Sequence, residues 1–157
     1  LLFSPSTIPQ SSGPTALRKN SGPSAYNLQP TTFRRMICVL GAAGGGRDKW
    51  KRPEMGKIAG EFCDEVILTD EDPYDENPTA IIEEIAVGFS QIPDPKSEIR
   101  KILDRREAIE KAISLAREGD VVVLTGKGSE SWIHLAGGKK MLWSERDAVL
   151  EAIDTAR

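Results

Sequence analysis

Short apolar runs separated by amphipathic segments form the main pattern of this chain. Met36–Leu40 is continuously apolar, which is typical of a strand buried on both faces of a parallel sheet. Glu65–Leu68 is the next predicted strand, and Asp120–Thr125, which contains Val-Val-Val-Leu, is a second fully apolar one. Residues 90–101 are ambiguous and admit a short edge strand near Ile99.

Helical signals lie between these strands. Pro53 suits the first turn of a helix that runs to about Phe62, and Pro78 begins another. A third helix follows Asp104, which has capping-box spacing with Glu107. Two of these helices carry apolar stripes at helical spacing, formed by Ile81, Ile82, Ile85 and Ala86 and by Ile109, Ala112, Ile113 and Ala116.

The last part of the chain predicts a helix end, a hairpin and a final helix. Gly119 is expected to close the third helix, as a C-terminal glycine does. Trp132–Leu135 and Lys139–Trp143 flank two glycines and predict a hairpin. Ser144 is expected to cap the last helix, with an acid at its third position.

Strands that alternate with helices of these lengths predict an α/β fold. We expect a Rossmann-like three-layer domain over residues 35–157, with a mostly parallel sheet, helices on both faces and a C-terminal hairpin. Residues 1–34 are predicted to be a disordered Ser/Pro-rich tail or linker, because this composition cannot bury enough apolar surface to offset ordering entropy. The basic, acid-free start also resembles an organelle transit segment, which is an alternative to a linker.

Charge and cysteine content exclude several classes of protein. The net charge is −3, and residues 1–36 carry +4, so the remainder carries −7. A domain this acidic is a poor nucleic-acid binder. Cys38 and Cys63 stand alone on apolar segments, and His134 is the single histidine, so we expect reduced core cysteines and no zinc site. The reduced cysteines indicate an intracellular, reducing compartment, so we expect a cytoplasmic protein. No apolar stretch approaches the roughly 20 residues of a membrane span, so we expect no membrane partner.

Three loops follow predicted strand ends, at residues 41–52, 69–77 and 126–131, and the ligand of an α/β sheet lies at such ends. In the first loop Gly41 and Gly46 have P-loop spacing, but Arg47 and Asp48 replace the Lys-Ser/Thr that a P-loop needs. The loop also does not match the Gly-x-Gly-x-x-Gly fingerprint of dinucleotide-binding proteins. Glycines followed by cations still favour an anion site, with a flexible solvated turn as the alternative.

The second loop, residues 69–77, holds five carboxylates within seven residues. Calcium is excluded because Pro73 and Tyr74 break the spacing of an EF-hand. The loop is either a rim that receives a cationic group, such as the amine of an amino acid, or a solvated acidic entry to a helix. In the third loop the glycines allow close backbone approach, and Glu130 could bind an ammonium group. We interpret His134 as a structural hairpin residue rather than a catalyst.

Five motifs in this order resemble the C-terminal domain of the Mur ligases, over about residues 36–156. They are Gly-Gly-Gly-Arg-Asp-x-x-Lys-Arg-Pro-x-Met-Gly from Gly44, Thr-Asp-Glu-Asp-Pro from Thr69, Asp-Arg-x-x-Ala-Ile from Asp104, Gly-Lys-Gly-x-Glu from Gly126 and Glu-Arg-Asp from Glu145. The resemblance implies an ATP-dependent ligase that adds a third residue, a diamino acid, to UDP-N-acetylmuramoyl-dipeptide in peptidoglycan synthesis. In that family ATP phosphorylates the peptide carboxylate, and the incoming amine attacks the acyl phosphate.

The resemblance also implies roles for particular residues. Arg47 matches the arginine that binds the carboxylate of the incoming amino acid, in keeping with its forked donors. Three residues of the second loop and two of the third match positions that hold the side chain and distal end of a diamino acid: Glu71, Asp72, Tyr74, Gly126 and Glu130. Lys51 and Arg52 are expected to face nucleotide or phosphate.

Departures from the family pattern narrow these expectations. Tyr74 stands where enzymes that select diaminopimelate have an arginine, so we favour lysine, ornithine or another basic amino acid. Gly46 and Ser129 replace residues that many relatives have as Asp and His. Nothing in the chain matches the central domain that holds ATP and Mg²⁺, so we expect the chain to be inactive in ligation without central and N-terminal domains. A stand-alone amino-acid or nucleotide binding module and a folylpolyglutamate-type ligase domain are the alternatives.

Overall fold

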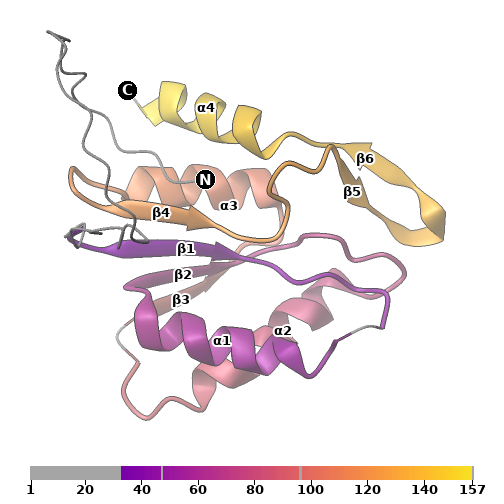
Figure 1. The fold of residues 1–157 in the computed structure, drawn as a ribbon, viewed down its shortest axis with the longest axis horizontal. Coiled ribbons are helices and arrows are strands. Elements are labelled where there is room, and N and C mark those ends of the chain that lie inside the picture. Colours follow the sequence, from indigo (N-terminus) through magenta and orange to yellow (C-terminus); the bar gives the residue numbers. More distant parts are fainter. Residues whose placement is uncertain (1–32, 47, 96, 157) are drawn as a thin grey trace, which may run out of the picture.

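The computed structural model describes residues 33–46, 48–95 and 97–156, and Figure 1 shows their arrangement. The elements are, in chain order, β1 (Met36–Leu40), α1 (Lys51–Phe62), β2 (Glu65–Leu68), α2 (Pro78–Ser90), β3 (Glu98–Lys101), α3 (Arg105–Leu115), β4 (Val121–Leu124), β5 (Trp132–His134), a 3₁₀ turn (Ala136–Gly138), β6 (Lys140–Leu142) and α4 (Glu145–Ala156). Of the tail predicted over residues 1–34, all but Phe33 and Arg34 lies outside the described residues.

The main sheet has four parallel strands in the order β3-β2-β1-β4, and β5 and β6 form a separate antiparallel hairpin. Helices α1 and α2 cover one face, and α3 covers the other, with α4 on the same side as α3 (Figure 1). The α/β class, the mostly parallel sheet, the helices on both faces and the hairpin are therefore confirmed. Among the described residues, no helix is both long and apolar enough to cross a membrane.

The alternation of side chains along β1 connects the sequence pattern with the two layers. Cys38 and Leu40 pack into the core under α1 and α2, whereas Ile37 and Val39 pack against α3. All four side chains are buried because β1 lies between β2 and β4 and has helices on both faces. A continuous apolar run is therefore the pattern that this central position requires.

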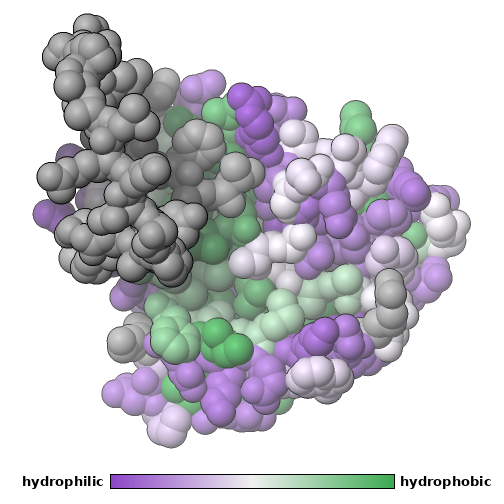
Figure 2. Space-filling model, in the orientation of Figure 1, coloured by the Kyte–Doolittle hydropathy of each residue, from purple (hydrophilic) through white to green (hydrophobic). Residues whose placement is uncertain are grey.

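The two edge strands of the sheet differ in character. β3 has charges at three of its four positions, a usual protection of a sheet edge. β4 is Val-Val-Val-Leu, and all four residues are half-buried because it pairs only with β1 among the described strands. Figure 2, in the orientation of Figure 1, shows hydrophobic surface at the level of the sheet between more hydrophilic regions. The strand at residues 120–125 is confirmed, but it is an edge strand with partial burial.

The end of α3 differs from the expectation. The helix ends at Leu115, four residues before Gly119, so Gly119 does not close it. The Arg35 guanidinium donates to the Leu115 carbonyl over 2.9 Å, and the Asp120 carboxylate accepts from the Arg117 N–H over 3.0 Å. These two contacts satisfy the helix end from outside the helix, which a search for a C-terminal glycine cannot detect.

The starts of the other helices follow the expectations closely. α1 begins at Lys51, two residues before the predicted Pro53, which lies in its first turn. Asn77 caps α2, whose first residue is Pro78, and the Asp104 carboxylate accepts from the Glu107 N–H at the start of α3. The Ser144 hydroxyl accepts the third N–H of α4 over 3.2 Å. The caps at Asp104 and Ser144 and the start at Pro78 were predicted from the sequence because they depend only on neighbouring residues, whereas the Asn77 cap was not predicted.

Helices α1 and α2 approach so closely that Gly56 has no room for a side chain. A Cβ at Gly56 would lie 1.9 Å from the Ile85 carbonyl oxygen. We therefore expect Gly56→Ala to lower the free energy of unfolding by about 2 kcal/mol or more, because the helices must separate. In an open helix the same change adds up to about 1 kcal/mol of stability.

Urea denaturation of the native chain and Gly56→Ala measures this loss. Lys57→Ala is the matched control, since Lys57 is the next residue on α1 and is exposed. The control should remain within about 0.5 kcal/mol of native. A stabilised Gly56→Ala variant would mean that the two helices do not touch at this position.

Candidate functional site

Three loops meet at the carboxyl ends of β2, β1 and β4, which are neighbours in the sheet. The first and second loops are joined by a hydrogen bond of 2.7 Å from the Gly44 N–H to the Asp72 carbonyl. The second and third are joined by an ion pair of 2.8 Å between Asp72 and Lys127. The loops that the sequence singled out separately therefore form one surface, as their places after parallel strands predict.

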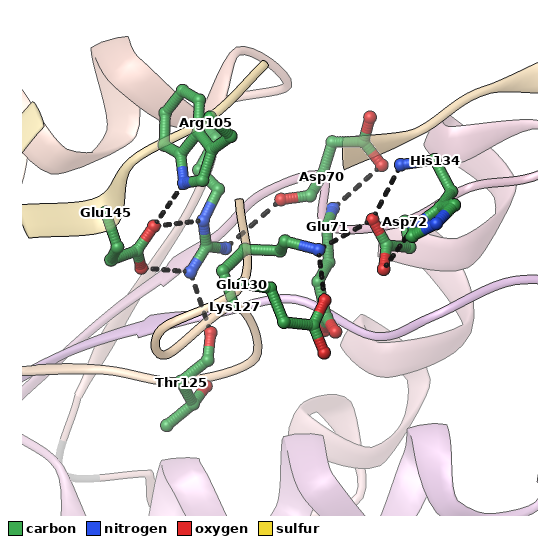
Figure 3. A network of polar contacts seen from close by, with 10 residues as sticks. Asp70, Glu71, Asp72, Arg105, Thr125, Lys127, Glu130, His134 and Glu145 are labelled. Atoms are coloured by element: carbon green, nitrogen blue, oxygen red, sulfur yellow. Dashed lines mark hydrogen bonds and ion pairs between the residues drawn. The ribbon is translucent and has the colours of Figure 1, made fainter. Parts of the chain in front are cut away.

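A buried ion pair lies beneath this surface. Arg105, the first residue of α3, makes a two-point contact with Glu145, the first residue of α4, and both side chains are at most 3% exposed. The remaining Arg105 donors reach the carbonyl oxygens of Asp70, at 3.2 Å, and Thr125, at 2.8 Å. The Trp143 indole N–H donates to Glu145 over 2.8 Å. One guanidinium thus connects the second loop, the residue directly before the third loop and α4, as Figure 3 shows.

Lys127 is the second buried cation of the site (Figure 3). Its side chain is fully buried, and its Nζ lies 2.8 Å from Asp72 Oδ1 and 2.7 Å from Glu130 Oε2. The same Asp72 oxygen accepts the backbone N–H of His134 over 2.8 Å. Lys127 therefore links the second and third loops, and Asp72 extends the link to β5.

The carboxylates of the second loop differ in their electrostatic environment. Burial raises the pKa of Asp72, but the hydrogen bonds from Lys127 and His134 outweigh it and hold the pKa below its usual range. Burial raises the pKa of Glu71, and the nearby Arg105 only partly offsets this. No hydrogen bond or ion pair reaches the Glu71 carboxylate from the described residues. Glu71 is thus the carboxylate of this cluster for which the described residues provide no partner.

Gly126 is required where the third loop passes Glu71. It has a φ of +107°, and a Cβ there would lie 2.6 Å from Glu71 Oε2. The backbone conformation disfavours any other residue, and a side chain would also require the Glu71 carboxylate to move. Gly126 was predicted to contact the substrate. In the structure, its contact with Glu71 already explains why a glycine is found there.

Tyr74 and His134 close one side of the second loop. Their rings stack with centroids 5.1 Å apart and planes within 15°. Tyr74 has a φ of +51°, an unusual backbone conformation for a tyrosine, and its N–H donates to the His134 carbonyl over 3.1 Å. His134 Nδ1 lies 3.4 Å from Asp72 Oδ2. His134 thus has a structural role at the hairpin.

Glu76 holds the first loop against the start of α2. It accepts the Gly46 N–H over 2.6 Å and pairs with Lys49 at 2.8 Å and Arg52 at 3.0 Å. Arg52 is buried, also pairs with Glu84 at 2.7 Å and donates to the Ala43 carbonyl over 2.9 Å. These contacts show that Arg52 fixes the first loop in place. Its predicted contact with nucleotide stays a prediction.

A cavity of about 280 Å³ lies between the first loop, α1 and the second loop. Its lining includes the exposed cation Lys51, Glu71 and Tyr74. A larger hollow of about 790 Å³ lies on the far side of the second loop, between the start of α3 and the hairpin, and none of the predicted site residues lines it. The smaller cavity is therefore the candidate site.

The structure brings together most of the residues predicted for the site. Glu71, Asp72, Tyr74, Gly126 and Glu130 lie in one cluster, and Lys51 lies across the cavity from Glu71. Arg47 lies outside the described residues.

The sequence reasoning missed three residues, namely Arg105, Lys127 and Glu145. All three stood inside the quoted motifs, but their partners lie up to 55 residues away, so no spacing rule identifies the pairs.

The fold and the three loops define a Rossmann-like domain with a ligand site at the carboxyl ends of its strands. A family model described as "Mur ligase, glutamate ligase domain" matches residues 24–128. The chain belongs to the Mur ligase family.

Curated relatives are ligases. The chain is 50% identical over 99 residues to UDP-N-acetylmuramoyl-L-alanyl-D-glutamate–2,6-diaminopimelate ligase of Syntrophomonas wolfei, covering 63% of this chain and 20% of the relative. It is 41% identical over 130 residues to the ligase of that name from Chlorobium phaeobacteroides, covering 83% and 24%. It is 46% identical over 119 residues to UDP-N-acetylmuramyl-tripeptide synthetase of Borreliella burgdorferi, covering 76% and 23%.

A solved structure of a UDP-N-acetylmuramoyl-L-alanyl-D-glutamate–2,6-diaminopimelate ligase matches with a TM-score of 0.68 and 33% identity, over 78% of this chain and 24% of that one. The chain thus spans about a quarter of the length of the relatives it matches. Within the described ranges, no three His, Cys, Asp or Glu side chains are grouped as metal ligands.

We expect Arg105→Met to lower the free energy of unfolding by about 3–5 kcal/mol, because Glu145 would remain buried without a counter-charge. Arg106→Met is the matched control, since the neighbouring Arg106 is 45% exposed and pairs with Glu151 at the surface. The control should lose about 1 kcal/mol or less. Urea denaturation measures both, and equal losses would contradict the central place of Arg105.

Glu76 gives a prediction about pH. The hydrogen bonds from Arg52, Lys49 and Gly46 lower the pKa of Glu76 to about 2. A pKa below the unfolded value of about 4.3 stabilises the folded chain above that pH, and the gain is lost as the pH falls towards 2. Urea denaturation between these pH values should show a shallower acid-induced loss in Glu76→Gln than in native. Identical slopes would exclude this role of Glu76.

Proposed function

We propose that the chain is the amino-acid-binding domain of an ATP-dependent ligase that joins a diamino acid to UDP-N-acetylmuramoyl-dipeptide. Membership of the Mur ligase family supports the reaction class. The observation that carries the site is the Glu71 carboxylate, which lines the 280 Å³ cavity and has no partner among the described residues. Glu71 is partly buried, and the nearby Arg105 and Lys127 offset the effect of this burial on its pKa only in part. A carboxylate in this position favours an ammonium group as its ligand.

The proposal gives each site residue a task. Glu71 and Glu130 bind the distal ammonium group of the amino acid, and Arg47 binds its carboxylate. The stacked Tyr74 and His134 form a wall beside the side chain. Gly126 allows the third loop to approach Glu71. Asp72 fixes the geometry through its contacts with Lys127 and His134.

We assign the binding of phosphate to the side of the cavity that carries Lys51 and Arg52. Lys51 is half-exposed on the cavity, so it can reach a phosphoryl group brought by a neighbouring domain. Arg52 supports that side by holding the Ala43 carbonyl and Glu76. ATP supplies the phosphoryl group that activates the peptide carboxylate, and we assign the binding of ATP and Mg²⁺ mainly to a central domain beyond this chain. The amine delivered by this domain then attacks the acyl phosphate, and the amide forms as phosphate leaves and the amine loses a proton.

The charge of the second loop favours lysine or ornithine over diaminopimelate. Tyr74 offers no charge to a distal carboxylate, whereas Glu71 adds a negative one to the cavity. Lys127 neutralises part of the charge of Asp72 and Glu130, so the preference depends chiefly on Glu71. The relatives whose names specify diaminopimelate provide the reference against which this preference is tested.

An NMR titration of the 157-residue chain with lysine, ornithine and diaminopimelate tests the pocket. We expect shifts at residues 69–77 and 126–131, weak affinity because half of the site is absent, and tighter binding of lysine or ornithine. Glu71→Gln should raise the dissociation constant for lysine about tenfold, since it removes a charge-assisted contact.

Glu83→Gln is the matched control, because Glu83 is an exposed glutamate of α2 that pairs with Lys101. It should bind lysine as the native chain does. Tightest binding of diaminopimelate would overturn the charge argument. Absence of binding by all three amino acids, together with an inert Arg47→Ala, would overturn the pocket itself.

A further inference from the structure

Lys127 does not line the cavity, although it lies at the centre of the carboxylate cluster. Its side chain is fully buried, and its two ion pairs join it to Asp72 and Glu130, two of the residues predicted for the site. A buried lysine is costly unless its charge is matched, so its place in the cluster needs a reason. Figure 3 shows its ammonium group between Asp72 and Glu130.

The two ion pairs of Lys127 differ in what they can contribute. Asp72 is 5% exposed, so its charge needs a partner inside the protein. The side chain of Glu130 is 59% exposed and would be well solvated without Lys127. The pair joins a fully buried ammonium group to a mostly exposed carboxylate, so solvent screens its Glu130 end. The contact with Glu130 therefore does more to fix the place of a carboxylate than to stabilise the fold.

We propose that Lys127 is a positioning residue, which holds Glu130 at a fixed distance from Glu71 so that both carboxylates can bind one ammonium group of the amino acid. This inference rests on the proposed function, because it assumes the same pocket. Glu71 and Glu130 repel each other, and the charge of Glu130 contributes to the raised pKa of Glu71. Without its anchor, Glu130 would turn towards water and leave Glu71 alone.

A double variant, Lys127→Met with Asp72→Asn, separates position from charge. It removes one positive and one negative charge, so the net charge of the cluster stays the same. The amide that replaces the Asp72 carboxylate can still accept the His134 N–H, and the methionine fills the space of the lysine stem. The anchor of Glu130 is lost, together with the ion pair between Lys127 and Asp72. Lys101→Met with Glu83→Gln is the matched control, since it removes a surface pair of the same charges.

Two readouts are taken on the full 157-residue chain. We expect the double variant to raise the dissociation constant for lysine about tenfold in the NMR titration, in line with the loss of a charge-assisted contact. We also expect lower ¹⁵N heteronuclear NOE values at residues 128–131, with unchanged values in β1 and β2. The control pair should change neither readout.

The outcomes separate this inference from the proposed function. If the native chain binds lysine and the folded double variant binds it with the same affinity, the positioning role is overturned but the pocket is not. If the native chain binds no amino acid, the proposed pocket fails, and unchanged NOE values in the double variant then overturn the role of Lys127 as well. If circular dichroism shows the double variant to be unfolded, Lys127→Arg replaces it, because it keeps the charge but moves the donor atoms. A folded Lys127→Arg with native affinity contradicts the proposal, and one with weakened binding supports it.

Discussion

The buried contact between Arg105 and Glu145 is the interaction on which the rest of the site depends. Two parallel strands deliver the second and third loops to one edge of the sheet, but strand pairing alone does not fix the loops beyond their strands. Arg105 does so by donating to the carbonyl of Asp70 in the second loop and to that of Thr125, directly before the third, while Glu145 balances its charge. The first turns of α3 and α4 thus become part of the floor of the site, and the Trp143 indole closes the network.

Contacts spread outward from this floor towards the cavity. Lys127 joins Asp72 to Glu130, Asp72 extends to the hairpin through the His134 N–H, and Glu76 fastens the first loop from the other side. Each contact satisfies a buried charge that would otherwise destabilise the fold. Glu71 is the exception, because no described residue satisfies it. The same network that orders the loops therefore leaves one carboxylate without a partner among the described residues, and this is the basis of the proposed amino-acid binding.

Local pattern predicted most of the fold, because strands, helix caps and the hairpin depend on neighbouring residues. The apolar run of β1, the start of α2 at Pro78 and the glycines of the hairpin are such cases. The loops of the site were also predicted, since each follows a strand. The sequence could not reveal the pairing of Arg105 with Glu145 or of Lys127 with Asp72, because these partners are 40 and 55 residues apart. The sequence also predicted that Gly119 would close α3. The Arg35 guanidinium, from the residue before β1, instead donates to the carbonyl of the last helical residue.

Hydrogen exchange of a double variant, Arg105→Met with Glu145→Met, tests most directly whether the buried pair organises the site. Exchanging both charges for apolar side chains removes the pair without leaving either charge unpaired, so the fold should persist. Our account predicts that amides of residues 69–77 and 126–131 lose protection while those of β1 and β2 keep it. Unchanged protection of both loops in the folded variant would contradict it.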